Sequence, residues 1–205
     1  MGVAQTINGV LRRLPAATIY LVSALYAGWE FWRALNQLGP YLVEPINVLE
    51  RAYGEIALIL LVAGLTVTPL RKWTGINLLK FRRAIGLSAF FFVLAHFLVF
   101  AILDVQSLGR VWEEVVKRPY VTVGMVSFLM LIPLALTSNN LSLRKMGAAS
   151  WRKLHKLTYP AAILGALHYL WLVKGFQIAP IIYLIVILGL VASRYLSLER
   201  KRQLA

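Results

Sequence analysis

The chain contains three histidines, and each lies in or beside a long apolar stretch. His96 and His168 lie deep inside two such stretches, and His155 lies at the edge of the second. An ionisable side chain is costly to place in a membrane-spanning helix, so its presence there indicates a functional role. The chain has no cysteine, which excludes disulfides, thiolate zinc sites, iron–sulfur clusters and the covalent attachment of a c-type heme. Two imidazoles on different helices therefore favour a noncovalently bound heme b in an electron carrier.

The two central histidines are expected at similar depth. His96 lies twelve residues into its stretch, about 18 Å along an α-helix, and His168 lies thirteen residues beyond His155, about 20 Å. Both would lie nearer the outer face, where a heme held edge-on between the two helices could take both rings as axial ligands. Gly165, one turn before His168, would either let the heme approach the backbone or serve close helix packing.

Other interpretations of the histidines stay open. They could form a hydrogen-bonded pair in a membrane core, or a path for protons or ions. Transporters usually carry intramembrane carboxylates or broken helices, whereas here only Glu30 and Glu55 lie within an apolar stretch, both at its ends. Met125 is an alternative axial ligand, although methionine on an apolar helix more often serves packing.

His155 has no partner histidine at its own level, where Arg82 and Arg83 stand on the earlier apolar stretch. It could ligate a second, inner heme with a different ligand, line a quinone or flavin pocket, or be an interfacial histidine. Arg82 and Arg83 could pair with heme propionates or a flavin phosphate, because guanidinium suits such anions. They could also serve only as determinants of membrane topology.

Composition predicts an all-α integral membrane protein. Hydrophobic residues make up 60% of the 205-residue chain and charged residues only 15%, and the mean hydropathy is +0.71. A soluble domain has about a quarter of its residues charged. Six apolar stretches approach the ~20 residues that cross a bilayer. They cover about 14–32, 55–70, 84–103, 120–137, 155–173 and 177–196, so we expect one six-helix bundle over residues 1–205.

The charges between these stretches alternate in sign. One side collects 16 of the 22 basic residues, and the other collects seven of the eight acidic residues. The positive-inside rule then places both termini in the cytoplasm. The net charge of +14 is accordingly a topology signal with some affinity for anionic lipid, and no nucleic-acid partner is expected. The outer segment 104–118 has the pattern of a short amphipathic helix on the membrane surface.

Three segments carry a family resemblance: RRAIGLSAFFFVLAHF, KRPYVTVGMVSFLMLIPLALTS and RKMGAASWRKLHKLTYPAAILGALHYLW. Over roughly residues 50–200 the chain resembles the heme-binding membrane subunits of bacterial protein-methionine-sulfoxide reductase systems, in the ferric-reductase-like transmembrane superfamily. Members of that superfamily carry two histidines thirteen residues apart on one helix, which His155 and His168 match. His96 matches the ligand on the third helix. The chain lacks a second histidine on that stretch.

The resemblance implies a specific role in the bacterial inner membrane. Similar proteins take electrons from the quinone pool and pass them outward through heme b to a periplasmic molybdopterin enzyme that reduces methionine sulfoxide in envelope proteins. FMN and a cytosolic flavin reductase are also associated with this family. The chain has no Gly-rich dinucleotide motif, so its electrons would come from a separate quinol or protein. The alternatives are a stand-alone quinol or ferric reductase of the superfamily, and a heme-free transporter.

Overall fold

A computed structural model of the chain describes residues 2–173 and 175–203, with side chains described as far as residue 196. Four cations of the charge count, Lys174, Arg200, Lys201 and Arg202, therefore have side chains outside the described part. Every regular element within the described ranges is helical. The α-helices are α1 (Val3–Arg13), α2 (Ala17–Leu35), α3 (Pro45–Thr74), α4 (Arg82–Leu98), α5 (Leu108–Lys117), α6 (Pro119–Leu136), α7 (Asn140–Leu154), α8 (Thr158–Leu172) and α9 (Ile178–Gln203). Shorter helical turns are η1 (Gly39–Leu42), η2 (Leu79–Phe81), η3 (Val99–Asp104) and η4 (His155–Leu157).

Four helical segments in the described part are long and apolar enough to cross a membrane: Pro45–Thr74, Leu79–Asp104, Pro119–Leu136 and Ile178–Leu196. The remaining two of the six expected stretches are also helical, as α2 and α8. The helix α8 has only 15 residues, because the 3₁₀ turn η4 precedes it. The helix α2 has 19 residues and carries Glu30 and Arg33 near its end. The structure is therefore that of an all-helical protein with membrane-spanning helices.

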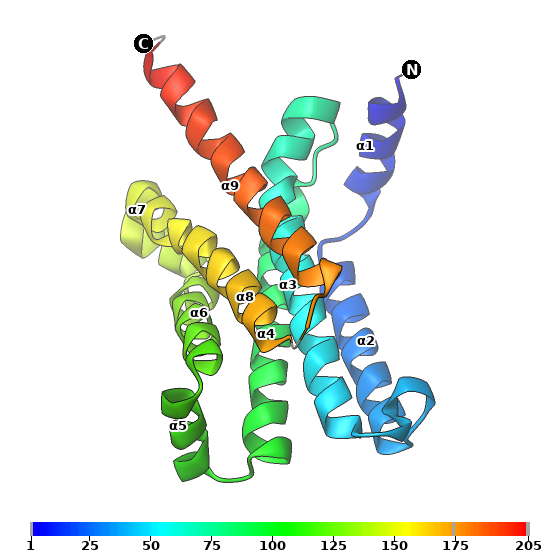
Figure 1. Cartoon of the computed structure of the whole chain (residues 1–205). Helices are drawn as coiled ribbons and strands as arrows, with labels where there is room; N and C mark the ends of the chain where they lie inside the picture. The colour runs from blue at the N-terminus through cyan, green and yellow to red at the C-terminus, as the bar shows by residue number, and fades with distance from the viewer. Residues whose placement is uncertain (1, 174, 204–205) are drawn as a thin grey trace.

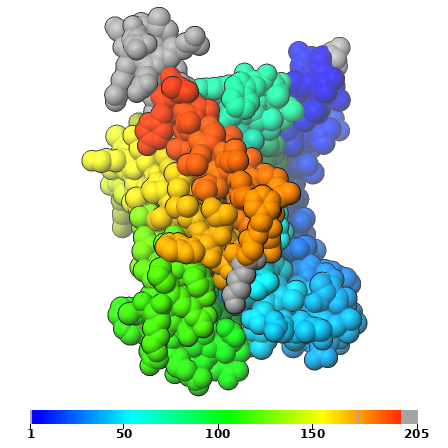
Figure 2. Space-filling model, in the orientation of Figure 1, coloured from blue at the N-terminus to red at the C-terminus, as the bar shows by residue number. Residues whose placement is uncertain are grey.

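The long helix α3 lies at the centre of the bundle. It packs against α2, α4, α8 and α9, while α6 packs chiefly against α8. The described ends of the chain lie at the same end of the molecule, and η1 and α5 lie at the opposite end (Figure 1). In the space-filling view, α8 and the first part of α9 cover the middle of the face toward the viewer (Figure 2).

Two helices at the end that holds the termini, α1 and α7, were not expected from the sequence. The side chain of Asn8 ties α1 to the loop after α3, since it donates to the carbonyl of Gly75 over 3.0 Å and accepts from the backbone of Asn77 over 2.9 Å. The helix α7 bends at Gly147, whose φ of 75° is accessible to glycine at little cost.

Close packing of α8 is permitted by three alanines, Ala161, Ala162 and Ala166, which are all 0% exposed. Small side chains let helix backbones approach within a membrane, where hydrophobic burial supplies little drive to associate. Ser127 of α6 adds a hydrogen bond across this contact, donating to the carbonyl of Ala161 over 2.8 Å. The position of α8, and hence of His168, is thereby fixed against α6 and α3.

Candidate functional site

The structure brings His96 of α4 and His168 of α8 together in the interior of the bundle. Their ring centres are 6.1 Å apart, and the ring planes are inclined at 75°. The two residues are 72 positions apart in the sequence, so only the packing of α4 and α8 on α3 and α6 brings them together. The helical rise per residue predicted similar depths for these two histidines.

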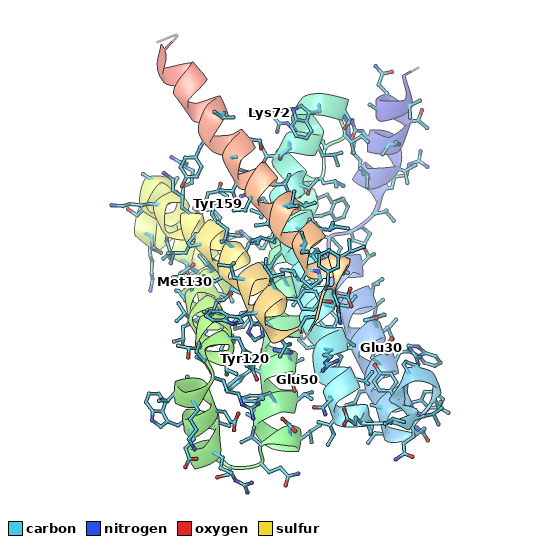
Figure 3. All side chains as sticks on the ribbon, in the orientation of Figure 1. Glu30, Glu50, Lys72, Tyr120, Met130 and Tyr159 are labelled. Carbon is cyan, nitrogen blue, oxygen red and sulfur yellow. The ribbon has the colours of Figure 1, made fainter. Side chains whose placement is uncertain are left out.

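Each ring is held through Nδ1 by a backbone carbonyl of a neighbouring helix. His96 Nδ1 lies 2.8 Å from the carbonyl oxygen of Glu50 on α3, and His168 Nδ1 lies 2.7 Å from that of Tyr120 on α6. Figure 3 shows Glu50 and Tyr120 at similar height on these two helices. A carbonyl oxygen can only accept, so each Nδ1 carries the proton and each Nε2 keeps its lone pair. Both histidines are therefore in the tautomer that binding a metal through Nε2 requires.

A glycine follows each acceptor carbonyl by four residues, and the imidazole lies against it. A Cβ at Gly54, four residues after Glu50, would come within 3.1 Å of His96 Nδ1. A Cβ at Gly124, four residues after Tyr120, would come within 2.7 Å of His168 Nδ1 and 3.0 Å of its Cε1. The same local arrangement of carbonyl and glycine thus occurs on α3 and on α6. Sequence reasoning missed both glycines.

The rings line a cavity of about 660 Å³. This volume lies within the range of about 300–1,000 Å³ that is usual for ligand and cofactor sites. Its walls are largely apolar, and the charged lining residues come from the first part of α3, the end of η3 and the residue before α6. The apolar lining includes Leu58, Leu61, Val93, Phe97, Phe100 and Phe128; the charged lining consists of Glu50, Arg51, Glu55, Asp104 and Arg118.

The spacing of the two rings fits one metal ion between them. Two imidazoles bound through Nε2 at about 2 Å, with each ring centre about 1 Å further back, would have centres about 6 Å apart, and the observed value is 6.1 Å. Among the described side chains, no group of three or more His, Cys, Asp or Glu could complete a metal site. A bare ion usually needs four ligands. A metal held in a planar macrocycle would need only two ligands from the protein, because the macrocycle supplies the others. Two imidazoles in an apolar cavity fit such a group.

Gly165 and Met125, the other candidates near the pair, both line this cavity. A Cβ at Gly165 would lie 3.6 Å from Ser127 Oγ and 3.9 Å from Leu58 Cδ1, which are ordinary contact distances. Gly165 therefore lies both at the cavity wall and in the contact between α8 and α6. Met125 is located on α6, next to Gly124.

His155 lies apart from the cavity, in the turn η4. Its Nε2 is 3.1 Å from Thr137 Oγ1, and its ring stacks on Trp151 with 3.7 Å between ring centres. The Thr137 hydroxyl proton is directed to the carbonyl of Pro133 over 2.6 Å, so Oγ1 accepts from His155 and Nε2 carries the proton. In this arrangement Nε2 of His155 is not free to bind a metal.

The two arginines of interest begin α4 at the same end of the molecule as His155. Arg83 donates to Asn140 Oδ1 over 2.9 Å, which links α4 to α7. Arg82 lies within electrostatic range of His155 and Arg194. Both arginine side chains are exposed. The structure thus groups Arg82, Arg83 and His155 at one end and separates them from the cavity.

Comparison with known proteins identifies the family of the chain. Residues 52–166, more than half of the chain, match the family described as the ferric reductase like transmembrane component. The matched segment includes His96 and His155 and ends two residues before His168. Proteins called protein-methionine-sulfoxide reductase heme-binding subunit MsrQ from Brucella ovis, Brucella canis and Brucella suis are each 42% identical to this chain over 178 residues, which are 86% of this chain and 79% of the relative. The chain therefore belongs to the ferric reductase like transmembrane component family.

Proposed function

We propose that this protein is a heme b electron-transfer subunit of the bacterial inner membrane, which delivers electrons to a periplasmic molybdopterin methionine-sulfoxide reductase. The observation that carries the proposal is the pair of imidazoles, His96 and His168, whose ring centres lie 6.1 Å apart and whose Nδ1 atoms are both held by backbone carbonyls, which leaves the Nε2 lone pairs available. The name of the similar Brucella proteins includes both heme binding and protein-methionine-sulfoxide reductase. Repair of oxidised envelope proteins would then be the purpose of the electron flow.

The residues of the chain would bind, orient and shield the heme, which itself supplies reversible one-electron chemistry at its iron. Both axial positions would be filled by imidazole, and this arrangement suits electron transfer more than the binding or activation of oxygen. The apolar walls exclude water, and the backbone carbonyls hold the rings in place. Catalysis on methionine sulfoxide would take place in the partner enzyme.

The proposed topology has six spanning helices, namely the four long ones together with α2 and α8, and places both termini in the cytoplasm. Two observations support it. The described ends of the chain lie at the same end of the molecule (Figure 1), and that side of the sequence collects 16 of the 22 basic residues. His96 and His168 would then lie closer to the periplasmic side, where the electron acceptor is located.

The electron donor in this proposal is the membrane quinone pool or a cytosolic flavin reductase, with FMN as a further cofactor. Arg82, Arg83 and His155 are the proposed contact residues for a donor at the cytoplasmic end. This assignment rests on their position, because the three residues lie together at the end of the molecule that carries the surplus of basic residues.

The first experiment compares visible spectra of the purified protein, oxidised and dithionite-reduced, with those of His96→Ala and His168→Ala. The wild type should show a low-spin b-type spectrum, and each variant should lose it or become high-spin. Met125→Leu is the matched control, because Met125 lines the same cavity, and it should retain the wild-type spectrum. A wild-type protein that binds no heme after reconstitution would refute the proposal and favour a heme-free transporter.

A second arm tests the partner. The dithionite-reduced protein should be reoxidised by the purified periplasmic reductase only when methionine sulfoxide is present. Rapid reoxidation by ferric citrate without that enzyme, together with no response to the enzyme and its substrate, would instead identify a stand-alone ferric reductase of the same family.

A further inference from the structure

The orientation of each imidazole in the cavity is set by a helix other than its own. His96 belongs to α4 and is held by α3, while His168 belongs to α8 and is held by α6. A hydrogen bond from Nδ1 to a fixed carbonyl opposes rotation of the ring about its bond to Cβ, since rotation would break it. In a helix this carbonyl also accepts the amide of the residue four positions on, so both its lone pairs are used.

The glycines determine how closely each ring approaches the holding helix. The Cβ of any other residue at position 124 would lie 2.7 Å from His168 Nδ1, nearer than such atoms can approach, and the ring would have to move. At position 54 the corresponding distance to His96 Nδ1 is 3.1 Å, so a smaller displacement would suffice. Glycine within a helix costs about 0.5–1 kcal/mol relative to alanine. The close contact with each imidazole explains why glycine occupies these two positions despite that cost.

From this arrangement, and resting on the proposed heme, we infer that Gly54 and Gly124 are positioning residues that hold the two axial imidazoles nearly perpendicular to each other. The observed angle between the ring planes is 75°. The carbonyls of Glu50 and Tyr120 fix the direction of each ring, and the glycines make room for it.

The angle has a measurable electronic consequence in ferric low-spin heme. The π orbital of each imidazole interacts with the iron d orbital that lies perpendicular to the ring plane. Parallel rings act on the same d orbital and separate it from its partner, which gives a rhombic EPR spectrum. Perpendicular rings act on both orbitals alike and leave them close in energy, which gives one dominant feature at low field with a large g value. Surrounding hydrogen bonds thus tune the metal through ligand orientation.

The test is low-temperature EPR of the full-length ferric protein in detergent, with the visible spectrum recorded on the same sample. The wild type should show the low-field feature of perpendicular imidazoles. Gly124→Ala should shift it toward the rhombic pattern or produce high-spin heme, and Gly54→Ala should give a smaller shift of the same kind. Gly64→Ala is the matched control, since Gly64 lies on α3 like Gly54 but does not line the cavity. Its Cβ would lie 3.7 Å from Ile85 Cγ2, an ordinary contact distance, and its spectrum should not change.

The outcomes separate this inference from the proposed function. A wild-type protein with low-spin heme and a rhombic spectrum refutes the perpendicular arrangement and leaves the proposed function intact. A Gly54→Ala protein that folds, binds heme and has the wild-type spectrum refutes the role of that glycine, even where Gly124→Ala does not fold. A wild-type protein without heme would instead refute the proposed function, because neither the EPR spectrum nor the visible spectrum would then show a heme signal.

Discussion

Replacing His155 with alanine should leave the heme content at one per chain and lower stability only modestly. His155 does not line the cavity that contains His96 and His168. Its Nε2 donates to Thr137 Oγ1 over 3.1 Å, and its ring stacks on Trp151. A neutral hydrogen bond contributes about 0.5–1.5 kcal/mol and an aromatic stack contributes about the same. The combined loss is therefore about 1–3 kcal/mol.

The assay measures heme per chain as the pyridine hemochrome and stability as the thermal unfolding midpoint in detergent. The His155→Ala protein should melt at a lower temperature but keep the wild-type heme ratio and spectrum. Thr137→Val, which removes the hydrogen-bond acceptor and keeps the imidazole, should lower the midpoint less, because it costs only about 0.5–1.5 kcal/mol of unfolding free energy. Two hemes per chain in the wild type, with one lost in His155→Ala, would refute the reasoning, because Nε2 would then bind iron instead of donating to Thr137.

Two further predictions concern hydrogen bonds that lie outside the cavity. Tyr41→Phe should destabilise the protein by about 1.5–3 kcal/mol, because the Tyr41 hydroxyl donates to the buried Glu30 carboxylate over 2.6 Å and such charged bonds are strong. Burial and, to a lesser extent, this bond raise the pKa of Tyr41 in the folded protein, whereas the phenol of the unfolded chain ionises near pH ~10. The difference in stability between the wild type and Tyr41→Phe, measured by thermal melts, should therefore be full below about pH 10 and shrink above it. A difference that grows above that pH would contradict this. Arg194→Leu should lower the melting temperature without changing the heme spectrum, since Arg194 donates to Tyr159 over 2.9 Å and to the carbonyl of Leu65 over 3.1 Å, outside the cavity. Loss of heme in that variant would show that α9 helps to form the site.

The pairing of His96 with His168 could be reached from the sequence because helix geometry is regular. The rise of about 1.5 Å per residue converts a position in an apolar stretch into a depth, and two residues of similar depth on neighbouring helices can meet. The long apolar stretches also identified the helices themselves. No such signal exists for α1 or α7, whose sequences are short, polar or basic.

The residues that hold the rings could not be reached in this way. Sequence reasoning singled out Gly165, one turn from His168 on the same helix, for either close approach of the heme or helix packing, because periodicity describes neighbours within a helix. Gly54 and Gly124 act across helices, and which faces meet depends on the tertiary packing of α3 with α4 and of α6 with α8. A signal was present only in retrospect: Gly54 directly precedes the apolar stretch 55–70, and Gly124 lies within the stretch 120–137.

His155 illustrates a different limit. The spacing of thirteen residues treats His155 and His168 as members of one helix, but the structure begins α8 at Thr158 and places His155 in the 3₁₀ turn before it. Pro160 falls in the first turn of α8, where its missing N–H costs no helical hydrogen bond. A spacing alone does not reveal this 3₁₀ turn.

The position of His96 and His168, the proposed heme ligands, bears on which electron donor is plausible. His96 follows Arg82, at the start of α4, by 14 residues, which corresponds to about 21 Å along the helix. Electron tunnelling slows exponentially with distance, so a soluble flavoprotein bound at the basic end would be a poor direct donor to a heme between His96 and His168. With His155 engaged by Thr137, the described histidines offer no second pair that could bridge this gap. A quinol dissolved in the bilayer could come closer to the proposed heme than that, so the distance supports our proposal of the quinone pool more than that of a flavin reductase as the direct donor.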